Sequence, residues 1–162
     1  MLDNIDKNPG IRYRQLLRLT GSSNGVLSYH LAELERSRFI KVDRKRGVTR
    51  YYPFHISAEI SKIIGYVRNS VSKQIISILL RKNGCTLGEI AAITKKAPST
   101  VSWHLQRMIK AEIVRKVSVG CKFSTYRVLD GKLVEKVLSS YLGSPVDRAV
   151  NDYSDLIDEL AL

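Results

Sequence analysis

Cysteine is scarce in this chain, and the two cysteines that occur, Cys85 and Cys121, lie far apart in the sequence. Neither belongs to a CxxC pair, and neither has a histidine at the spacing of a metal site. We therefore expect a reduced intracellular protein without a disulfide framework, a metal or another cofactor. Cys85 is most simply a small buried side chain, whereas Cys121, near an expected hairpin tip, could be exposed and open to oxidation.

Long apolar runs are also missing. The richest one, residues 75–80, includes Ser77 and is far shorter than the ~18 residues that a membrane span requires. No signal peptide pattern opens the chain, so we expect a cytoplasmic protein that does not enter membranes. A glycine-rich phosphate loop, a nucleophile with a paired base and a carboxylate cluster are all absent from the sequence, and we therefore expect no enzymatic activity.

Acidic residues are few relative to basic ones: 15 Asp and Glu stand against 27 Lys and Arg, giving a formal net charge of +12. The basic excess lies in residues 1–130, whereas residues 131–162 are acidic on balance. A basic globular body indicates a polyanionic partner. Nucleic acid is favoured over an anionic membrane, because no basic amphipathic helix is present.

One stretch of the sequence occurs twice. SYHL at residues 28–31 returns as SWHL at residues 102–105, an offset of 74 residues. The flanking residues align at the same offset: Gly10 with Gly84, Thr20 with Thr94, Leu34 with Met108, and Tyr52 with Tyr126. The repeat predicts two copies of one supersecondary unit, each so small that further packing or an oligomer should help its core.

The apolar periodicity predicts the same element order in both copies. The first copy should have helices at 2–8, 11–20 and 22–36 and a hairpin at 39–53; the second should have helices at 71–82, 86–94 and 98–112 and a hairpin at 113–129. Helix 11–20 should turn Leu16, Leu17 and Leu19 inward and end at Gly21; helix 22–36 should bury Val26, Leu27, Leu31 and Leu34 and expose Asn24, Ser28, Tyr29 and Ala32.

Three further helices complete the expected organisation. Residues 57–69 should form a connecting helix with Ile60, Ile63, Ile64 and Val67 on its apolar face, covering the side left open by the short first helix. Another should follow Asp130, and a last one should start at Ser144. Val146, Val150, Tyr153, Ile157 and Leu160 give it a coiled-coil-like seam, which would serve a homodimer through 146–160 or pack on its own repeat; both options remain open.

The order helix, helix, helix, hairpin is that of a winged helix-turn-helix. The chain resembles the ArsR/MarR-like winged-helix transcription regulators over residues 1–130, with SxHL on the recognition helix and the hairpin as a wing on the DNA backbone. NPGIRYRQL, SNGVLSYHLAELE and TRYYP are similar to tandem winged-helix regulators of methanogens, including regulators of the archaellum, which implies an archaeal protein.

The expected fold class is therefore mainly α with small β-hairpin wings (α+β). Two tandem winged helix-turn-helix domains, 1–56 and 71–130, should be joined by a connecting helix, 57–70, and followed by C-terminal helices, 131–162. The expected function is sequence-specific binding of double-stranded DNA by a transcription regulator.

Two sets of side chains are candidates for DNA contact. Those expected at base edges are Asn24, Ser28, Tyr29, Thr100, Ser102, Trp103 and Gln106. Those expected at phosphates are Arg44, Lys45, Arg46 and Arg50 on the first wing, with Lys122 on the second. Lys122 is the one cation of the segment SVGCKFST, which leaves backbone contact by the second wing in question.

Each of these interpretations has a plainer alternative. His30 and His104 could suggest metal sensing, but without ligand-spaced neighbours they are better read as structural residues at the core edge. Tyr29 and Trp103 could instead pack between repeats or on a second subunit. The rival function is a protein-interaction scaffold, in which one or both units bind other components of the transcription machinery.

Overall fold

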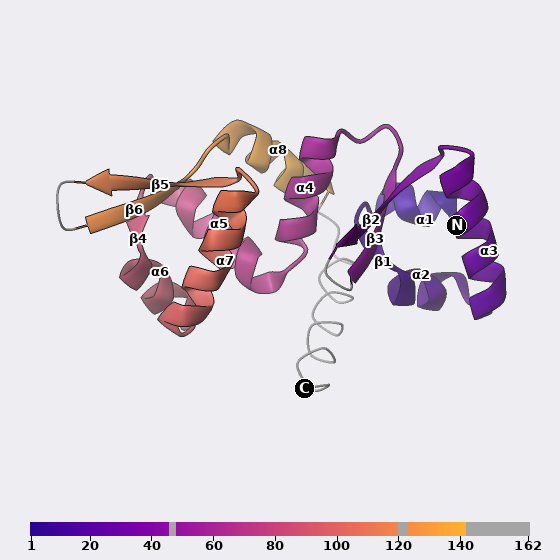
Figure 1. Ribbon diagram of the computed structural model, residues 1–162, viewed down its shortest axis with the longest axis horizontal. Helices are drawn as coiled ribbons and strands as arrows, with labels where there is room; N and C mark the ends of the chain where they lie inside the picture. The colour runs from indigo at the N-terminus through magenta and orange to yellow at the C-terminus, as the bar shows by residue number, and fades with distance from the viewer. Residues whose placement is uncertain (46–47, 120–122, 142–162) are drawn as a thin grey trace. The chain divides into compact units, whose positions relative to one another are not determined.

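The computed structural model describes residues 1–45, 48–119 and 123–141, without the side chains of Lys45, Val119 and Phe123. The described chain divides into two compact units: residues 1–65 with 140–141, and residues 66–139. Figure 1 shows the first unit in indigo to magenta and the second in magenta to yellow. Residues 144–162, with the expected seam at 146–160, lie outside the described residues.

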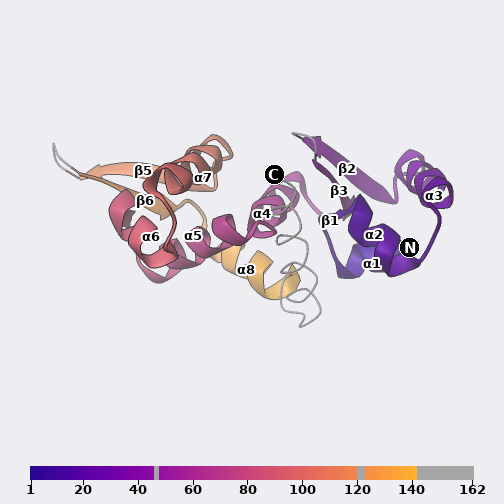
Figure 2. The same cartoon turned by 90° about the horizontal axis from the view of Figure 1, so that it is seen from below.

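The first unit combines helices with a three-stranded sheet, and Figures 1 and 2 show how they are arranged. Its elements are α1 (Leu2–Lys7), β1 (Ile11–Arg12), α2 (Tyr13–Thr20), α3 (Asn24–Arg36), β2 (Ile40–Lys45) and β3 (Val48–Pro53), and α4 (Ala58–Val67) follows. The sheet is antiparallel in the order β1-β3-β2. β1 was not expected, because the sequence pattern assigned Ile11 and Arg12 to the helix that begins at Tyr13.

The turn between α2 and α3 follows the expected chemistry. Gly21 has φ 61°, a left-handed conformation that ends α2, and its N–H donates to the carbonyl of Leu17. Ser23 occupies the N-cap of α3 in an extended conformation, although its side chain makes no capping hydrogen bond. α3 begins at Asn24, two residues after the expected start, and ends at Arg36 as the sequence predicts, with Ser37 at its C-cap.

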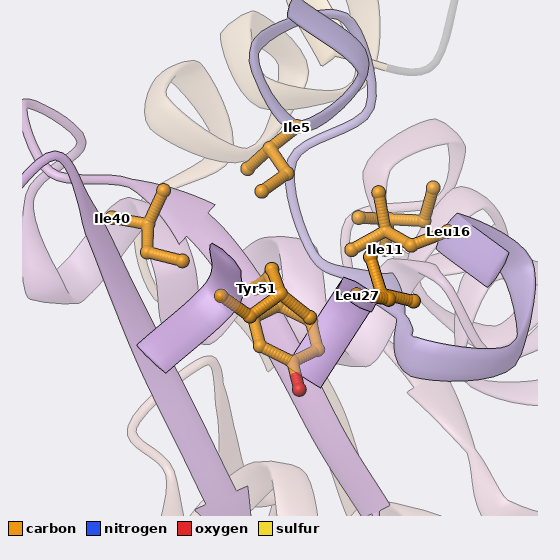
Figure 3. Close-up of a cluster of buried hydrophobic side chains, with 7 residues drawn as sticks. Ile5, Ile11, Leu16, Leu27, Ile40 and Tyr51 are labelled. Carbon is orange, nitrogen blue, oxygen red and sulfur yellow. The ribbon is translucent and has the colours of Figure 1, made fainter. Parts of the chain in front are cut away.

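The core of the first unit lies between the helices and the sheet. Figure 3 shows Ile5, Ile11, Leu16, Leu27, Ile40 and Tyr51 converging there. Two predicted core residues are wrong: Val26 is 50% exposed and Leu19 is 44% exposed. Val26 precedes Leu27 and so points about 100° away from the stripe that Leu27 begins. Leu19 is in the last turn of α2, beyond Leu17, with which the core contacts of that helix end.

The second unit has the same element order. Its elements are α5 (Ser70–Arg81), β4 (Cys85–Thr86), α6 (Leu87–Thr94), α7 (Pro98–Lys110), β5 (Val114–Val119), β6 (Phe123–Val128) and α8 (Gly131–Tyr141). The sheet order is β4-β6-β5. Thr86 and Glu89 form the expected capping box, with the Glu89 N–H 3.3 Å from Thr86 Oγ1 and the Thr86 N–H 2.8 Å from Glu89 Oε2. Asp130 caps α8 by accepting from the Leu133 N–H at 2.9 Å.

The offset of 74 residues relates most elements of the two units without error, including α3 to α7 and β2 to β5. It fails at the last strand, because one more residue separates β5 from β6 than separates β2 from β3. Tyr51 pairs with Ile11 and Tyr126 pairs with Cys85. Tyr126 therefore corresponds to Tyr51, and the predicted match with Tyr52 is wrong by one residue.

The connecting helix approaches the first unit at Gly10 and Tyr52. Ile63 and Ile64 of α4 are buried there. Gly10, in the turn after α1, has φ 79°, and a Cβ there would lie 2.9 Å from Ile64 Cγ2 and 3.1 Å from Tyr52 Cε1. This close approach requires glycine.

Cys85 is buried as expected, and Cys121 is outside the described residues. Among the helices described, none is long and apolar enough to cross a bilayer.

Candidate nucleic-acid interface

The outward face of α3 carries the side chains that the sequence assigns to base contact. Asn24 and Ser28 are exposed, and Tyr29 is 68% exposed. The Tyr29 ring meets His30 edge to face, with ring centroids 5.6 Å apart. His30 is itself exposed, which corrects its interpretation as a core-edge residue. The face is thus open to a partner, with small polar groups next to an aromatic ring.

Tyr13, from the start of α2, joins this face and was missed from the sequence. Its hydroxyl donates to the carbonyl oxygen of Asn24 at 3.0 Å, with Asn24 Oδ1 at 3.3 Å, and shares a 2.9 Å hydrogen bond with Ser28 Oγ. A comparison of the two copies could have singled out Tyr13, because it is aromatic and polar where the second copy has the apolar Leu87. Tyr13 thus links the two helices at the N-terminal turn of α3.

The first wing does not gather its four predicted cations at one place. Arg44 pairs with Thr49 across the strands, so Arg50, the neighbour of Thr49, lies on the opposite face of the sheet. Arg50 Nη1 donates to the Gly10 carbonyl at 2.8 Å. Arg46 and the side chain of Lys45 are outside what the structure describes.

Arg44 instead makes an ion pair with α3. Its Nη1 and Nη2 donate to Glu35 Oε1 and Oε2 at 2.7 and 2.5 Å, a two-pronged contact. The hydrogen bond from Arg44 lowers the pKa of the Glu35 carboxyl, and the same contact raises the pKa of Arg44. Both groups are thus charged at neutral pH. The positive charge of Arg44 on the first wing is therefore offset by Glu35 of α3.

In the second unit, α7 presents a different surface. Thr100 and Gln106 are exposed and Ser102 is half-buried. Trp103 is 52% exposed, with the guanidinium carbon of Arg107 4.3 Å from its ring centroid. This is a cation–π contact, which leaves the indole held along α7.

His104 has the structural role that the sequence favours. Its Nδ1 lies 2.9 Å from Oγ of the buried Ser72, and its ring meets Trp103 edge to face at 4.8 Å. Burial lowers the pKa of His104, and the neighbouring Arg107 lowers it further. His104 is therefore neutral at physiological pH. No group of three or more His, Cys, Asp or Glu suited to a metal ion occurs in the described part of the chain.

Several exposed cations near these helices were not singled out from the sequence. They lie on α2, in the turn before α7 and on β5: Arg14, Arg18, Lys95, Lys96, Arg115 and Lys116. Arg115 and Lys116 matter most, because the expectation of a charge-poor second wing counted only its tip, where Lys122 lies outside the described residues. The strands of that wing supply positive charge that its tip sequence does not show.

The chain is similar in sequence to known DNA-binding proteins. Residues 68–115 match the family of winged helix-turn-helix DNA-binding domains. An uncharacterized HTH-type transcriptional regulator of Methanocaldococcus jannaschii is 27% identical over 119 residues, covering 74% of this chain. The chain spans only 30% of that relative's length.

Two solved repressor structures are also similar over about half of the chain. The antimony-specific transcriptional repressor AntR has 23% identity and a TM-score of 0.45, with 51% of this chain and 78% of that one covered. The transcriptional repressor BigR from Xylella fastidiosa has 19% identity and a TM-score of 0.45, with 52% and 84% covered. These values are too low to bear on what this chain binds.

The family match falls on the second unit and runs from Arg68, before α5, to Arg115 at the start of β5. The matched segment therefore contains the helix-turn-helix, and β5 and β6 supply its wing. Winged-helix regulators are not enzymes, in agreement with the sequence expectation. Residues 68–115 are thus similar to the winged helix-turn-helix DNA-binding family, and the first unit has the same order of elements.

Proposed function

We propose that the chain is a transcription regulator that binds double-stranded DNA in a sequence-specific manner through two tandem winged helix-turn-helix domains. The observation that carries this proposal is the outward face of α3, where Asn24, Ser28 and Tyr29 are exposed on the second helix of a helix-turn-helix. A helix of 13 residues with such a face fits the major groove. The first unit repeats the element order of the unit that matches the family, which supports the tandem arrangement.

The predicted contacts divide by chemistry. Base edges would be read by Asn24, Ser28 and Tyr29 of α3 and by Thr100, Ser102, Trp103 and Gln106 of α7. Phosphates would be held by wing cations: Arg115 and Lys116 on β5, with Arg46 and Lys122, which lie outside the described residues. Phosphate contacts fix position and base contacts supply specificity.

A homodimer through residues 146–160 would double the number of recognition helices. The apolar spacing of those residues supports it, although they lie outside the described part of the structure. An archaeal origin is supported by the similarity to the methanogen regulator.

The alternative is an interaction scaffold, in which one or both units bind a protein of the transcription machinery. The exposed Trp103 favours it, since a large aromatic ring backed by Arg107 is typical of the anchors of protein interfaces. The alternative applies to one or both units, because Tyr29 on α3 is also an exposed aromatic side chain of the kind that anchors interfaces.

Selection of bound sites from a random duplex pool, followed by titration of the enriched and random duplexes, tests the proposal. We expect enrichment of a defined sequence, and the double variant Ser28→Ala with Tyr29→Ala should weaken binding to it by ~1 to 3 kcal/mol per lost base contact. Binding to random duplex should change little, and the melting temperature should stay near that of the wild type.

Two outcomes would contradict this. A chain that enriches no sequence, yet remains folded, is a scaffold and not a reader of DNA. A collapse of the melting temperature in the double variant would show that Ser28 and Tyr29 support the fold.

A further inference from the structure

The ion pair between the first wing and α3 has a consequence for DNA binding. We propose that Glu35 is a negative determinant of affinity: it holds Arg44 away from the DNA backbone, so that the first wing makes one phosphate contact fewer than its sequence suggests. This inference rests on the proposed function. It assigns a role to Glu35, which the charge pattern of the sequence does not single out.

The alternation of β2 explains why Arg44 meets the helix. Side chains two residues apart on a strand share a face, so Ile40, Val42 and Arg44 point the same way. Ile40 is fully in the core of the first unit and Val42 packs against it. Arg44 continues this line beyond the edge of the core, and its guanidinium therefore reaches α3 and not the solvent on the far side of the wing.

The contact is specific in its geometry. Both terminal nitrogens of Arg44 donate to the two oxygens of Glu35, at 2.7 and 2.5 Å. This end-on contact occupies the fork between Nη1 and Nη2, so a phosphate could use only the Nε–H and the outer N–H groups of the guanidinium. Glu35 thus competes with DNA for the end-on fork of Arg44 and offsets the positive charge that would attract a phosphate.

Solvent exposure weakens the ion pair, so the carboxylate of Glu35 and a DNA phosphate compete for Arg44 on similar terms. The side chains are 60% exposed for Arg44 and 36% exposed for Glu35, so the pair is weak in absolute terms. A carboxylate held close by does not need to bind strongly to exceed one phosphate, because it is present in every molecule at fixed distance. The penalty is the same on every DNA sequence, since phosphates carry no sequence information.

The chain offers a matched control on the same helix. Glu33 lies two residues before Glu35, pairs with Arg36 at 2.6 Å, and has a side chain 43% exposed. Its pKa is also lowered, chiefly by the hydrogen bond from its arginine. Glu33→Gln and Glu35→Gln therefore make the same change of charge at similar exposure, but only Glu35→Gln frees a wing cation.

The test is a salt series on the full chain with a random duplex, for both Gln variants and for Arg44→Ala alone and combined with Glu35→Gln. Each phosphate contact contributes about 0.9 to the slope of log K against log salt. We expect Glu35→Gln to steepen the slope by about 0.9 relative to Glu33→Gln, which is an extra fall in affinity of roughly 3.5-fold between 50 and 200 mM salt. Arg44→Ala should leave the wild-type slope unchanged and should abolish the gain in the combined variant.

Two results would overturn the inference. Equal slopes for Glu35→Gln and Glu33→Gln would mean that the pair does not restrain the wing. A slope flattened by about 0.9 in Arg44→Ala alone would mean that Arg44 already contacts a phosphate. Failure of the wild type to bind any duplex would instead reject the proposed function. Melting curves of all variants establish that each one is folded.

Discussion

Replacing Tyr13 by Phe tests whether the polar cluster at the start of α3 sets base recognition. The change removes one oxygen and keeps the ring, so the half-buried position of the side chain between α2 and α3 is preserved. Three polar contacts of the hydroxyl are lost, two to Asn24 and one to Ser28. Within the described part of the chain, no other hydrogen bond then holds the side chains of Asn24 and Ser28 in one conformation.

The expected magnitude follows from these contacts. A net hydrogen bond contributes about 1 kcal/mol, and the cluster is exposed, so its loss should cost the fold no more than about that amount. On DNA, the side chains must be ordered at the moment of binding, at about 0.5 to 1.5 kcal/mol for each immobilised side chain. For the two side chains, Asn24 and Ser28, this sums to about 1 to 3 kcal/mol. Because 1.4 kcal/mol is about tenfold in affinity, we expect a loss of at least about fivefold on the selected site.

The assay is a titration of the selected and the random duplex at several salt concentrations. The loss should appear on the selected duplex, with less than about a twofold change on random DNA and an unchanged salt slope, because no phosphate contact is removed. The reasoning also predicts that Tyr13→Phe and Ser28→Ala are not additive, since Tyr13 acts through Ser28. Equal losses on both duplexes, or additive losses in the double variant, would refute this role of Tyr13.

Two further predictions concern stability and assembly. The Thr86 backbone N–H, Lys82 and the Thr86 hydroxyl lower the pKa of Glu89 from 4.5 to about 2, so its carboxylate stabilises the fold above pH 4.5 and this contribution is lost as the pH falls toward 2. Thermal melts should therefore show a steeper loss of stability between pH 4.5 and 2 in the wild type than in Glu89→Gln; parallel curves would contradict the capping role. Truncation after Gly143 should convert a dimer to a monomer in sedimentation, and a full-length chain that is already monomeric at micromolar concentration would reject dimerisation through 146–160.

The helices of both units could be predicted from the sequence because two signals agreed. Apolar spacing gave the inward face of α3 at Leu27 and Leu31, and the repeat gave the matching stretch of α7. The chemistry of the ends was also local, as at Gly21 and at the capping box of α6. Signals that lie within a few residues of the feature they specify can be read without a structure.

The features that were missed depend on partners distant in the chain. β1 and β4 have two residues each, too few for any periodicity, and exist because they pair with β3 and β6. Tyr51 matches Tyr126 because the segment between β5 and β6 is one residue longer than that between β2 and β3. A constant offset of 74 residues does not allow for this difference. Arg44 looked like one of four equivalent cations, because the count of charge along a hairpin does not tell which face each residue occupies.

The two recognition-type helices, although equal in length and related by the repeat, differ in the chemistry around them. Tyr13 corresponds to Leu87, so the hydroxyl that organises the start of α3 has no counterpart at α7. Glu33 corresponds to Arg107, which covers one face of Trp103, whereas no cation lies over the Tyr29 ring in the part of the chain that the structure describes. Glu35 corresponds to Ile109, which cannot restrain a cation. Two units with these differences would contact unlike half-sites, so the DNA selected by the whole chain should have two dissimilar halves and not a repeat of one.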